Sequence, residues 1–275
     1  MTVRALLPLL ALAPAFVVAP AAAEDSALTL AKKLTNPFSD VINLPINQNP
    51  DFGLAADDGW RYTLTAQPVI PFRLDHEWHL ISRTVAPVIY QDSGGAADFG
   101  LGDIAQSLFL SPTHASEEGW FWGLGPIFLL PTATVDRFGA EQWGLGPTLG
   151  LLTRAGPWTV GALTNHIFSL AGHEGESDVN TTFLQPFVDY TLESKTTLSI
   201  NTESTYDWTN EQWTAPIHLV VRQLFDFFDS RVSVALGGRY YVAAPEAGPE
   251  WGVRLGVTFI FPRTSPAPTS RMTPR

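Results

Sequence analysis

The stretch that decides the fold lies near the C-terminal end of the chain, at residues 251–261, and reads WGVRLGVTFIF. Its odd-numbered residues are all large and apolar, whereas Gly252, Arg254, Gly256 and Thr258 lie between them. Alternation with a period of two is typical of a β-strand with one apolar face. The strand ends at Pro262, and its apolar face must meet either a protein core or lipid.

The same alternation recurs through most of the chain and predicts eleven strands, with a weaker twelfth at residues 40–48. Apolar and polar residues separate most clearly in GWRYTLTAQPVIPF (59–72) and RVSVALGGRYYV (231–242). The predicted strands are 40–48, 59–72, 78–90, 99–110, 119–130, 142–153, 157–169, 179–191, 195–208, 212–223, 231–242 and 251–261.

The connections between these strands alternate in length. Short or polar turns near 73–77, 111–118, 154–157, 192–195 and 225–230 alternate with links that are mostly longer and rich in Gly, Asp and Pro. Bacterial outer-membrane barrels have short periplasmic turns, longer external loops and an even strand number. The sequence therefore predicts an all-β, transmembrane antiparallel β-barrel of about 12 strands with both ends in the periplasm.

Aromatic residues gather near the predicted strand ends, as expected for girdles at the two membrane interfaces. A soluble β-sandwich would sooner bury tryptophan in the middle of its strands. The predicted girdle consists of Trp60, Trp78, Trp120, Trp122, Trp143, Trp158, Trp208, Trp213, Trp251 and Phe261.

Prolines at several mid-strand positions oppose this interpretation, because proline removes a donor from the hydrogen-bond ladder. We expect β-bulges at several of them. These prolines are Pro68, Pro87, Pro126, Pro147, Pro186 and Pro216.

The N-terminal region predicts export across the inner membrane. Residues 1–23 combine Arg4, a short apolar run interrupted by proline, and small residues before Glu24, which is typical of a cleaved signal peptide. Residues 24–39 contain apolar residues at helical spacing and predict a short helix, either a plug of the lumen or a leader to the barrel. The barrel then covers 40–261, and the Pro-rich 262–275 is expected to be a disordered tail.

Charge and composition exclude several classes of protein. The full chain has 16 basic and 27 acidic residues; without Arg4 of the signal peptide the balance is 15 to 27, a net charge of −12. A nucleic-acid partner would require a basic face. The absence of cysteine excludes disulfides, thiolate metal sites and a cysteine nucleophile.

Charged residues on the polar strand faces would line the lumen of such a barrel, because charges facing lipid are costly. They either set the selectivity of a pore or form a salt-bridge network that closes it. Twelve strands enclose a narrower lumen than porins of 16–18 strands, which favours a gated or specific path. The candidate lumen-lining residues are Arg61, Arg83, Glu203, Asp207, Arg239 and Arg254.

Catalytic and metal motifs are weak. His166 and Ser169 lie three residues apart, on opposite faces of a strand, so they cannot form a local nucleophile–base pair. The acidic cluster around Glu174 and Asp178 matches no calcium-loop spacing, and a solvated loop explains it; calcium binding there stays open. We expect no catalytic residue, no metal and no cofactor.

Several segments carry a family resemblance, among them WHLISRTVAPVIYQ, GPIFLLPTAT, NTESTYDW and GPEWGVRLGVTFIFPR. Over about residues 30–263 the chain resembles bacterial outer-membrane putative transporters similar to the MetA-pathway of phenol degradation family, some of which carry the label neuromedin U. The resemblance implies an outer-membrane barrel that moves small, often aromatic or hydrophobic, molecules.

The sequence thus predicts an outer-membrane transporter or channel for small molecules in a Gram-negative bacterium. Its expected partners are outer-membrane lipids, a small-molecule solute and the barrel-assembly machinery. The alternatives are a structural or adhesive barrel with a closed lumen, an outer-membrane hydrolase, and a soluble periplasmic β-sandwich.

Overall fold

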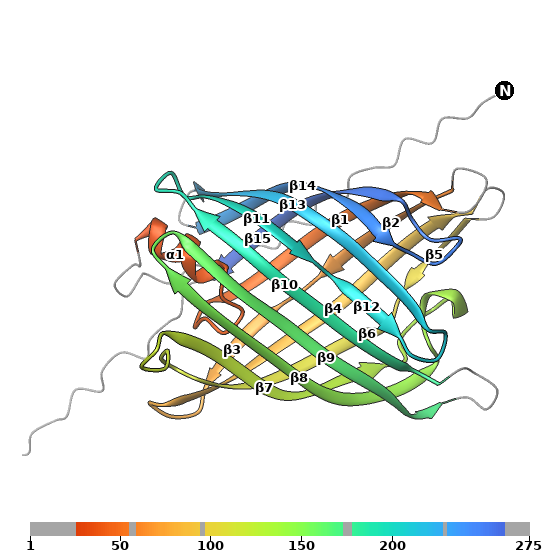
Figure 1. The fold of residues 1–275 in the computed structure, drawn as a ribbon, viewed down its shortest axis with the longest axis horizontal. Coiled ribbons are helices and arrows are strands. Elements are labelled where there is room, and N and C mark those ends of the chain that lie inside the picture. The colour runs from red at the N-terminus through yellow and green to blue at the C-terminus, as the bar shows by residue number, and fades with distance from the viewer. Residues whose placement is uncertain (1–25, 55–58, 94–96, 173–177, 228–229, 262–275) are drawn as a thin grey trace, which may run out of the picture.

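The computed structural model is a closed antiparallel β-barrel with one short helix at one end (Figure 1). It describes residues 26–54, 59–93, 97–172, 178–227 and 230–261. The signal peptide and the tail predicted from the sequence lie outside the described residues. Three strands are interrupted, β2/β3, β5/β6 and β11/β12, so the fifteen segments form twelve strands and confirm the predicted fold class.

The elements follow the chain in this order: α1 (Ala27–Leu34), β1 (Ile42–Leu54), β2 (Gly59–Ala66), β3 (Val69–Arg73), β4 (Trp78–Asp92), β5 (Ala97–Leu101), β6 (Ile104–Pro112), β7 (Trp120–Leu130), the 3-10 helix η1 (Asp136–Phe138), β8 (Gln142–Ala155), β9 (Trp158–Gly172), β10 (Asn180–Thr191), β11 (Thr196–Thr202), β12 (Ser204–Asp207), β13 (Gln212–Phe227), β14 (Ser230–Ala243) and β15 (Trp251–Phe261).

The first and last strands close the barrel. β1 pairs with β15 over nearly its full length, from Ile42 opposite Phe261 to Phe52 opposite Trp251. All strand pairs are antiparallel, and closure leaves no long strand edge unpaired. The stretch 251–261 is therefore the closing strand, as its alternation and position predict.

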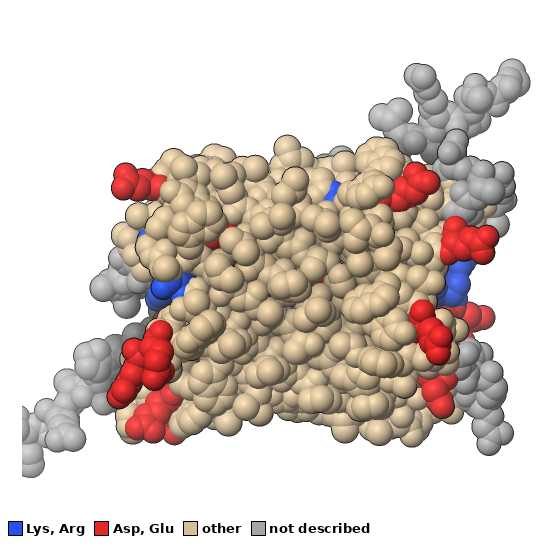
Figure 2. Space-filling view, in the orientation of Figure 1, with Lys and Arg blue, Asp and Glu red and all other residues tan. Residues whose placement is uncertain are grey.

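The two faces of the wall differ as predicted. On the face that Figure 2 shows, a broad, largely uncharged belt covers the middle of the barrel, and most charged residues gather at the two ends. A soluble protein would not expose so large an apolar surface. Exposed apolar residues along the belt include Leu124, Leu149, Leu151, Val160, Leu184, Leu198, Ile200, Ile217, Leu219, Val221, Val234, Leu236 and Leu255.

The end that carries the turns at 74–77 and 192–195 is called the inner end, after the orientation expected above. β1 begins and β15 ends there, since Ile42 pairs with Phe261. In the turn at 74–77, the Asp75 carboxylate accepts hydrogen bonds from the backbone N–H groups of Glu77 and Trp78, at 2.7 and 2.8 Å. These bonds hold the pKa of Asp75 below its ordinary value.

The prolines are accommodated mostly by gaps in pairing, and not by the several bulges expected from the sequence. A register shift marks Pro216, but Pro68 falls in the break between β2 and β3. Pro126 and Pro147 face each other, and the ladder on the far side of each is interrupted. Because proline has no N–H to donate, a gap in pairing beside it leaves fewer unmet hydrogen bonds, which explains why a closed barrel tolerates these prolines.

The first strand is longer than its sequence pattern indicates. The alternation is visible only to residue 48, but β1 continues to Leu54. Residues 49–54 contain Pro50, Asp51 and Gly53, which are typical of turns. Pairing with β15 and β2 overrides this local preference and brings Asp51 into the lumen wall.

Helix α1 lies at the inner end of the barrel (Figure 1). The Ser26 hydroxyl caps it by accepting a hydrogen bond from the backbone N–H of Thr29 at 3.1 Å. Leu30 and Ala31 are buried and form a cluster with Leu224 of β13 and Ile260 of β15. The helix therefore packs on the inward face of the wall. Among the described residues no helix is long and apolar enough to cross a membrane.

Candidate channel lumen

An ion pair inside the barrel joins strands that are not neighbours in the sheet. Arg254 of β15 donates two parallel hydrogen bonds to the Glu203 carboxylate, from Nη1 at 2.7 Å and from Nη2 at 2.8 Å. Its Nε donates to Asn49 Oδ1 of β1 at 2.8 Å. Glu203 lies in the break between β11 and β12, so the pair joins two parts of the wall that are separated by β13 and β14. Bidentate geometry of this kind fixes both side chains.

A second ion pair lies on β1 and β14. Arg239 donates from Nε and Nη2 to the two oxygens of Asp51, and Tyr241 donates its hydroxyl to Asp51 Oδ1 at 3.2 Å. Both charged side chains are nearly inaccessible, with 7% and 6% exposed. This pair compensates one arginine fully and contributes no net charge to the lumen.

Arg61 and Arg83 are held differently from these two arginines. Arg61 Nε donates to Gln91 Oε1 at 2.8 Å, and Arg83 Nη2 donates to Gln67 Oε1 at 3.3 Å. Neither arginine has a carboxylate within ion-pair distance among the described residues. Each side chain is thus positioned by a neutral amide and keeps its positive charge in the lumen wall.

Asp207 lies apart from the other lumen candidates. Its carboxylate accepts hydrogen bonds from the backbone N–H groups of Thr209 and Asn210 and from the Asn210 amide, at 2.8–3.2 Å. These bonds stabilise the turn between β12 and β13. The structure therefore brings Glu203, Arg254, Asp51 and Arg239 into two pairs, and leaves Asp207 as a turn-stabilising group at the outer end.

The N-terminal segment seats Phe38 inside the barrel. Phe38 is 3% exposed and packs with Ile81, Phe109, Leu152 and Leu163 from four strands of the wall. Its ring meets Phe109 edge-on at 5.6 Å between centroids.

Two glycines make room for this ring. A Cβ added at Gly123 would lie 2.7 Å from Phe38 Cε1, and one at Gly150 would also overlap the ring. Glycine at positions 123 and 150 thus has a packing reason.

Polar contacts also hold the segment to the wall. Lys32 donates from Nζ to the carbonyl oxygen of Gly156 at 3.0 Å, and Arg154 donates from Nη2 to the carbonyl oxygen of Lys32 at 2.7 Å. The Thr35 hydroxyl bonds that of Thr159 at 3.1 Å. With Phe38, these contacts place residues 26–39 across the inner end of the lumen.

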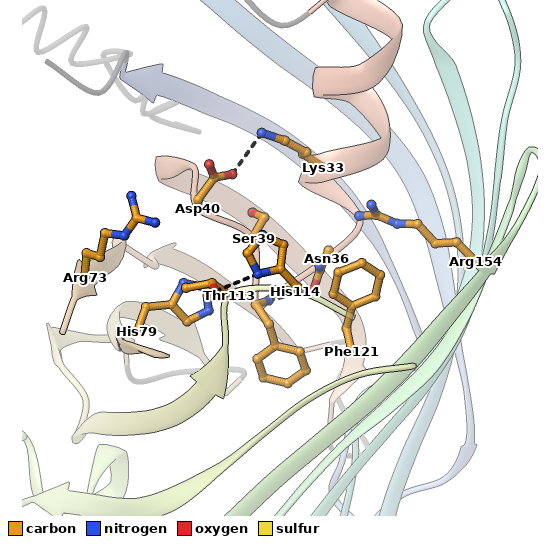
Figure 3. Close-up of a pocket in the computed structure, with 11 residues that line it drawn as sticks. Lys33, Asn36, Ser39, Asp40, Arg73, His79, Thr113, His114, Phe121 and Arg154 are labelled. Atoms are coloured by element: carbon orange, nitrogen blue, oxygen red, sulfur yellow. Dashed lines mark hydrogen bonds and ion pairs between the residues drawn. The ribbon is translucent and has the colours of Figure 1, made fainter. Parts of the chain in front are cut away.

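A pocket remains beside this segment (Figure 3), with a volume of about 300 Å³. Lys33 and Asp40, which form an ion pair at 3.0 Å, lie on the side of the pocket that the N-terminal segment forms. Arg73, His114 and Arg154 approach it from the barrel side. The pocket is richer in basic than in acidic groups.

The loop between β7 and β8 folds over the inner face of β5 at the outer end. Phe99 and Leu101 point outward and are exposed, so Gly100 between them faces inward, where the loop residues Val135 and Phe138 cover it. The Asp103 carboxylate accepts hydrogen bonds from three backbone N–H groups, those of Thr132, Ala133 and Ala140, at 2.7–3.0 Å. This loop narrows the outer mouth.

The structure gives the hydrolase candidate no support. His166 Nδ1 bonds the Thr182 hydroxyl at 2.7 Å, whereas Ser169 donates to Asp178 at 3.1 Å, so His166 and Ser169 have separate partners. The part of the chain that the structure describes contains no cluster of ligands for a metal ion. Glu174 lies outside that part.

The predicted girdle residues lie at the two ends of the strands. At the inner end Trp78 contacts Trp122 and Trp158 contacts Tyr190, with centroids 5.9 and 4.7 Å apart. At the outer end Trp60 contacts Tyr90, Phe52 stacks on Trp251, and Tyr206 contacts both Trp208 and Trp213. Trp120, the first residue of β7, and Trp143, the second residue of β8, are exposed, and Phe261 ends β15.

Three residues of the lumen wall were not among the candidates predicted from the sequence. Asp51 lay in a segment interpreted as a loop, and Arg154 in one interpreted as a turn. Arg222 was on the polar face of its strand, but its contact with Asp189 at 3.5 Å depends on strands that are not sequential. Of the three, only Arg222 could have been predicted to face the lumen from the alternation of polar and apolar residues.

Together, the fold and the lumen define a closed antiparallel barrel with an apolar outer belt and a charged interior that is narrowed at both ends. No protein-family model matches the chain, and no curated protein matches it.

Among solved structures, the chain is similar to an outer membrane channel from Pseudomonas putida F1, with a TM-score of 0.62 and 13% identity over 81% of this chain and 95% of that one. It is also similar to the NanC porin (TM-score 0.48, 10% identity, 81% and 100% covered) and to outer membrane phospholipase A from Escherichia coli (0.44, 16%, 86% and 96%). At 13% identity, the similarity to the Pseudomonas channel shows a shared barrel fold and nothing finer. The TM-scores of the other two are below 0.5, so no conclusion is drawn from them. The resemblance to the MetA-pathway family stays a prediction.

Proposed function

We propose that the protein is a channel of the bacterial outer membrane that passes small molecules through its lumen. The observation that carries the proposal is the contrast between the two faces of one closed wall. The outer face is an uncharged belt between two aromatic rims, and the inner face holds charged side chains, among them Arg61 and Arg83 without carboxylate partners among the described residues. Charges in such a wall are expected to meet water and solute.

The lumen is restricted, which supports passage of small solutes only. The pair of Glu203 and Arg254 occupies part of it, the loop at 131–141 covers part of the outer mouth, and Phe38 fills part of the inner end. A twelve-stranded wall also encloses less space than the wall of a general porin. Outer-membrane lipids and the barrel-assembly machinery are the proposed partners, and the family resemblance favours hydrophobic or aromatic cargo.

A structural barrel with a closed lumen is the second candidate. The observation that favours it is the seating of the N-terminal segment, which contacts strands on both sides of the inner end. In this alternative the ion pairs only stabilise the barrel. No catalytic role is proposed.

Solute flux separates these two candidates. Proteoliposomes that contain the chain from residue 24 should swell in small neutral solutes, at rates that fall steeply as the solute grows, because the lumen is restricted. Heat-modifiable migration in detergent gels serves as the control that the barrel is folded. A folded barrel whose vesicles swell no faster than protein-free vesicles in any solute would contradict the channel.

A further inference from the structure

A buried histidine lies beside the ion pair of Glu203 and Arg254. His218 belongs to β13, whose neighbouring residues Ile217 and Leu219 are exposed on the outer face, so the histidine ring faces inward. The residue is 0% exposed, and neither ring nitrogen has a hydrogen-bond partner among the described residues. A buried polar group without a partner costs free energy, so this arrangement points to a second state in which the ring is bonded.

Three charged side chains lie close to this ring. Glu203 from the break between β11 and β12, Arg239 from β14 and Arg254 from β15 all act on it electrostatically. While the ring is neutral, the charges form two pairs, Arg254 with Glu203 and Arg239 with Asp51. A proton on His218 adds a third cation beside the two arginines, and Glu203 is the carboxylate that acts on the ring.

Acceptors for a protonated ring are already in place. Asn201 of β11 lies directly opposite His218 in the ladder of β11 and β13, and its Oδ1 is buried without a partner among the described residues. Glu203 follows two residues later in the chain. A protonated histidine donates from both nitrogens, whereas the neutral ring donates from one. Asn201 thus provides an acceptor for one N–H of the charged ring, and Glu203 provides the opposite charge for the other.

Arg254 has a second partner on its own side of the barrel. Its Nε donates to Asn49 Oδ1 of β1, the strand paired with β15, whereas its Nη atoms reach Glu203 beyond β14 and β13. When Glu203 turns to a charged histidine, Asn49 still holds the arginine against its own part of the wall. The Glu203 side chain is 29% exposed, so water reaches the pair and can deliver the proton.

We propose that His218 is a proton-binding site that controls this ion pair. Once protonated, the ring competes with Arg254 for the Glu203 carboxylate and releases the arginine. The proton binds better to the released state, because the carboxylate then faces the ring and one cation has moved away, so proton uptake shifts the population toward release. The consequence for conduction rests on the proposed function: release removes one restriction of the lumen, and the channel conducts more at acidic pH.

The side-chain Nε–H resonance of Arg254 tests the release itself, by NMR of the folded chain from residue 24 in detergent micelles. Histidine changes its charge between about pH 8 and about pH 5, so the resonance should shift over this range as the contacts with Glu203 are lost. His218→Gln keeps a polar side chain but takes up no proton. This variant should abolish the shift.

Single-channel recording over the same pH range tests the consequence. The conductance of the unsubstituted chain should rise about twofold at acidic pH, because release of the pair clears part of a narrow lumen. The rise should be absent in His218→Gln. Glu203→Ala should give the raised conductance already at neutral pH, since Arg254 then has no carboxylate to reach, and its conductance should not depend on pH.

His166→Gln is the matched control. His166 is also a histidine of a barrel strand, but its Nδ1 bonds the Thr182 hydroxyl at 2.7 Å. It lies three residues from Leu163, which packs inside the barrel, so it faces outward. Its replacement should leave both pH responses unchanged. An Arg254 resonance that does not shift, either response persisting in His218→Gln, or a conducting barrel indifferent to pH would each overturn the switch.

The release and the proposed function can fail separately. A resonance shift that depends on His218, in a folded barrel that passes no ions, would contradict the channel and leave the release standing. A conducting barrel in which the Arg254 resonance ignores pH would overturn the release and leave the channel standing.

Discussion

Phe38→Ala should raise the mean conductance of the barrel several-fold. Phe38 is the least exposed apolar residue of the described N-terminal segment, and it packs into a recess whose glycines leave room for the ring. Truncation of a buried phenylalanine typically costs about 3–5 kcal/mol. This free energy is lost only when the N-terminal segment is packed inside the barrel with the ring in its recess. The variant should therefore spend more time with the segment displaced from the lumen, which opens the inner end. Single-channel recording measures the effect.

Phe52→Ala is the matched control for this prediction. Phe52 has the same side chain, but it lies at the outer end and stacks on Trp251, with centroids 4.6 Å apart. It should leave the conductance unchanged while removing a similar aromatic contact. Equal conductance in the chain from residue 24, Phe38→Ala and Phe52→Ala would show that the segment does not gate the lumen.

Asp51→Ala should reduce the free energy of unfolding by about 3–5 kcal/mol, because it leaves Arg239 as a buried charge without its partner. Both side chains of this pair are buried, whereas Arg222 in the pair with Asp189, and Glu203 in the pair with Arg254, are partly exposed. Tyr241 would lose its acceptor as well. Equilibrium unfolding by denaturant, in lipid vesicles that allow refolding, measures the change.

Asp226→Ala provides the comparison. Asp226 bonds Lys195 and Arg231, but its side chain is 56% exposed, so its removal should reduce the free energy of unfolding much less than removal of Asp51 does. The double variant Asp51→Ala/Arg239→Ala should recover part of the loss, because it removes the stranded charge. Similar losses for Asp51→Ala and Asp226→Ala would contradict the difference in burial.

Much of the barrel could be predicted from the sequence, because its signals are local. A wall with lipid on one side and water on the other imposes alternation on every strand, and 59–72, 231–242 and 251–261 follow it almost without exception. Strand positions, the strand number and the inward direction of Arg254 follow from this alternation. The short helix follows from a separate local signal, apolar residues at helical spacing.

The partners across the lumen could not be predicted, because they depend on geometry between strands distant in the chain. Arg254 faces inward by its position in β15, but its distance from Glu203 depends on the break between β11 and β12. Asp51 belongs to a segment whose local residues favour a turn, and only pairing with two neighbouring strands makes it part of the wall.

The pocket at the inner end was also beyond the sequence. It forms because Phe38 enters the barrel, and that entry depends on Gly123 and Gly150 lying side by side in β7 and β8. Glycine in these strands does not by itself tell which side chain occupies the space beside it. Arg73 and Arg154 lay in or beside predicted turns, so neither was a candidate for the lumen.

Planar-bilayer recording of the chain from residue 24, with Phe38→Ala in parallel, tests the central claim most directly. The account predicts discrete conductance steps from the folded protein and larger ones from the variant, because both have a charged lumen and only the variant lacks the seated ring. A folded barrel that gives no steps above the bare membrane, in either form, would contradict the channel and favour the closed structural barrel.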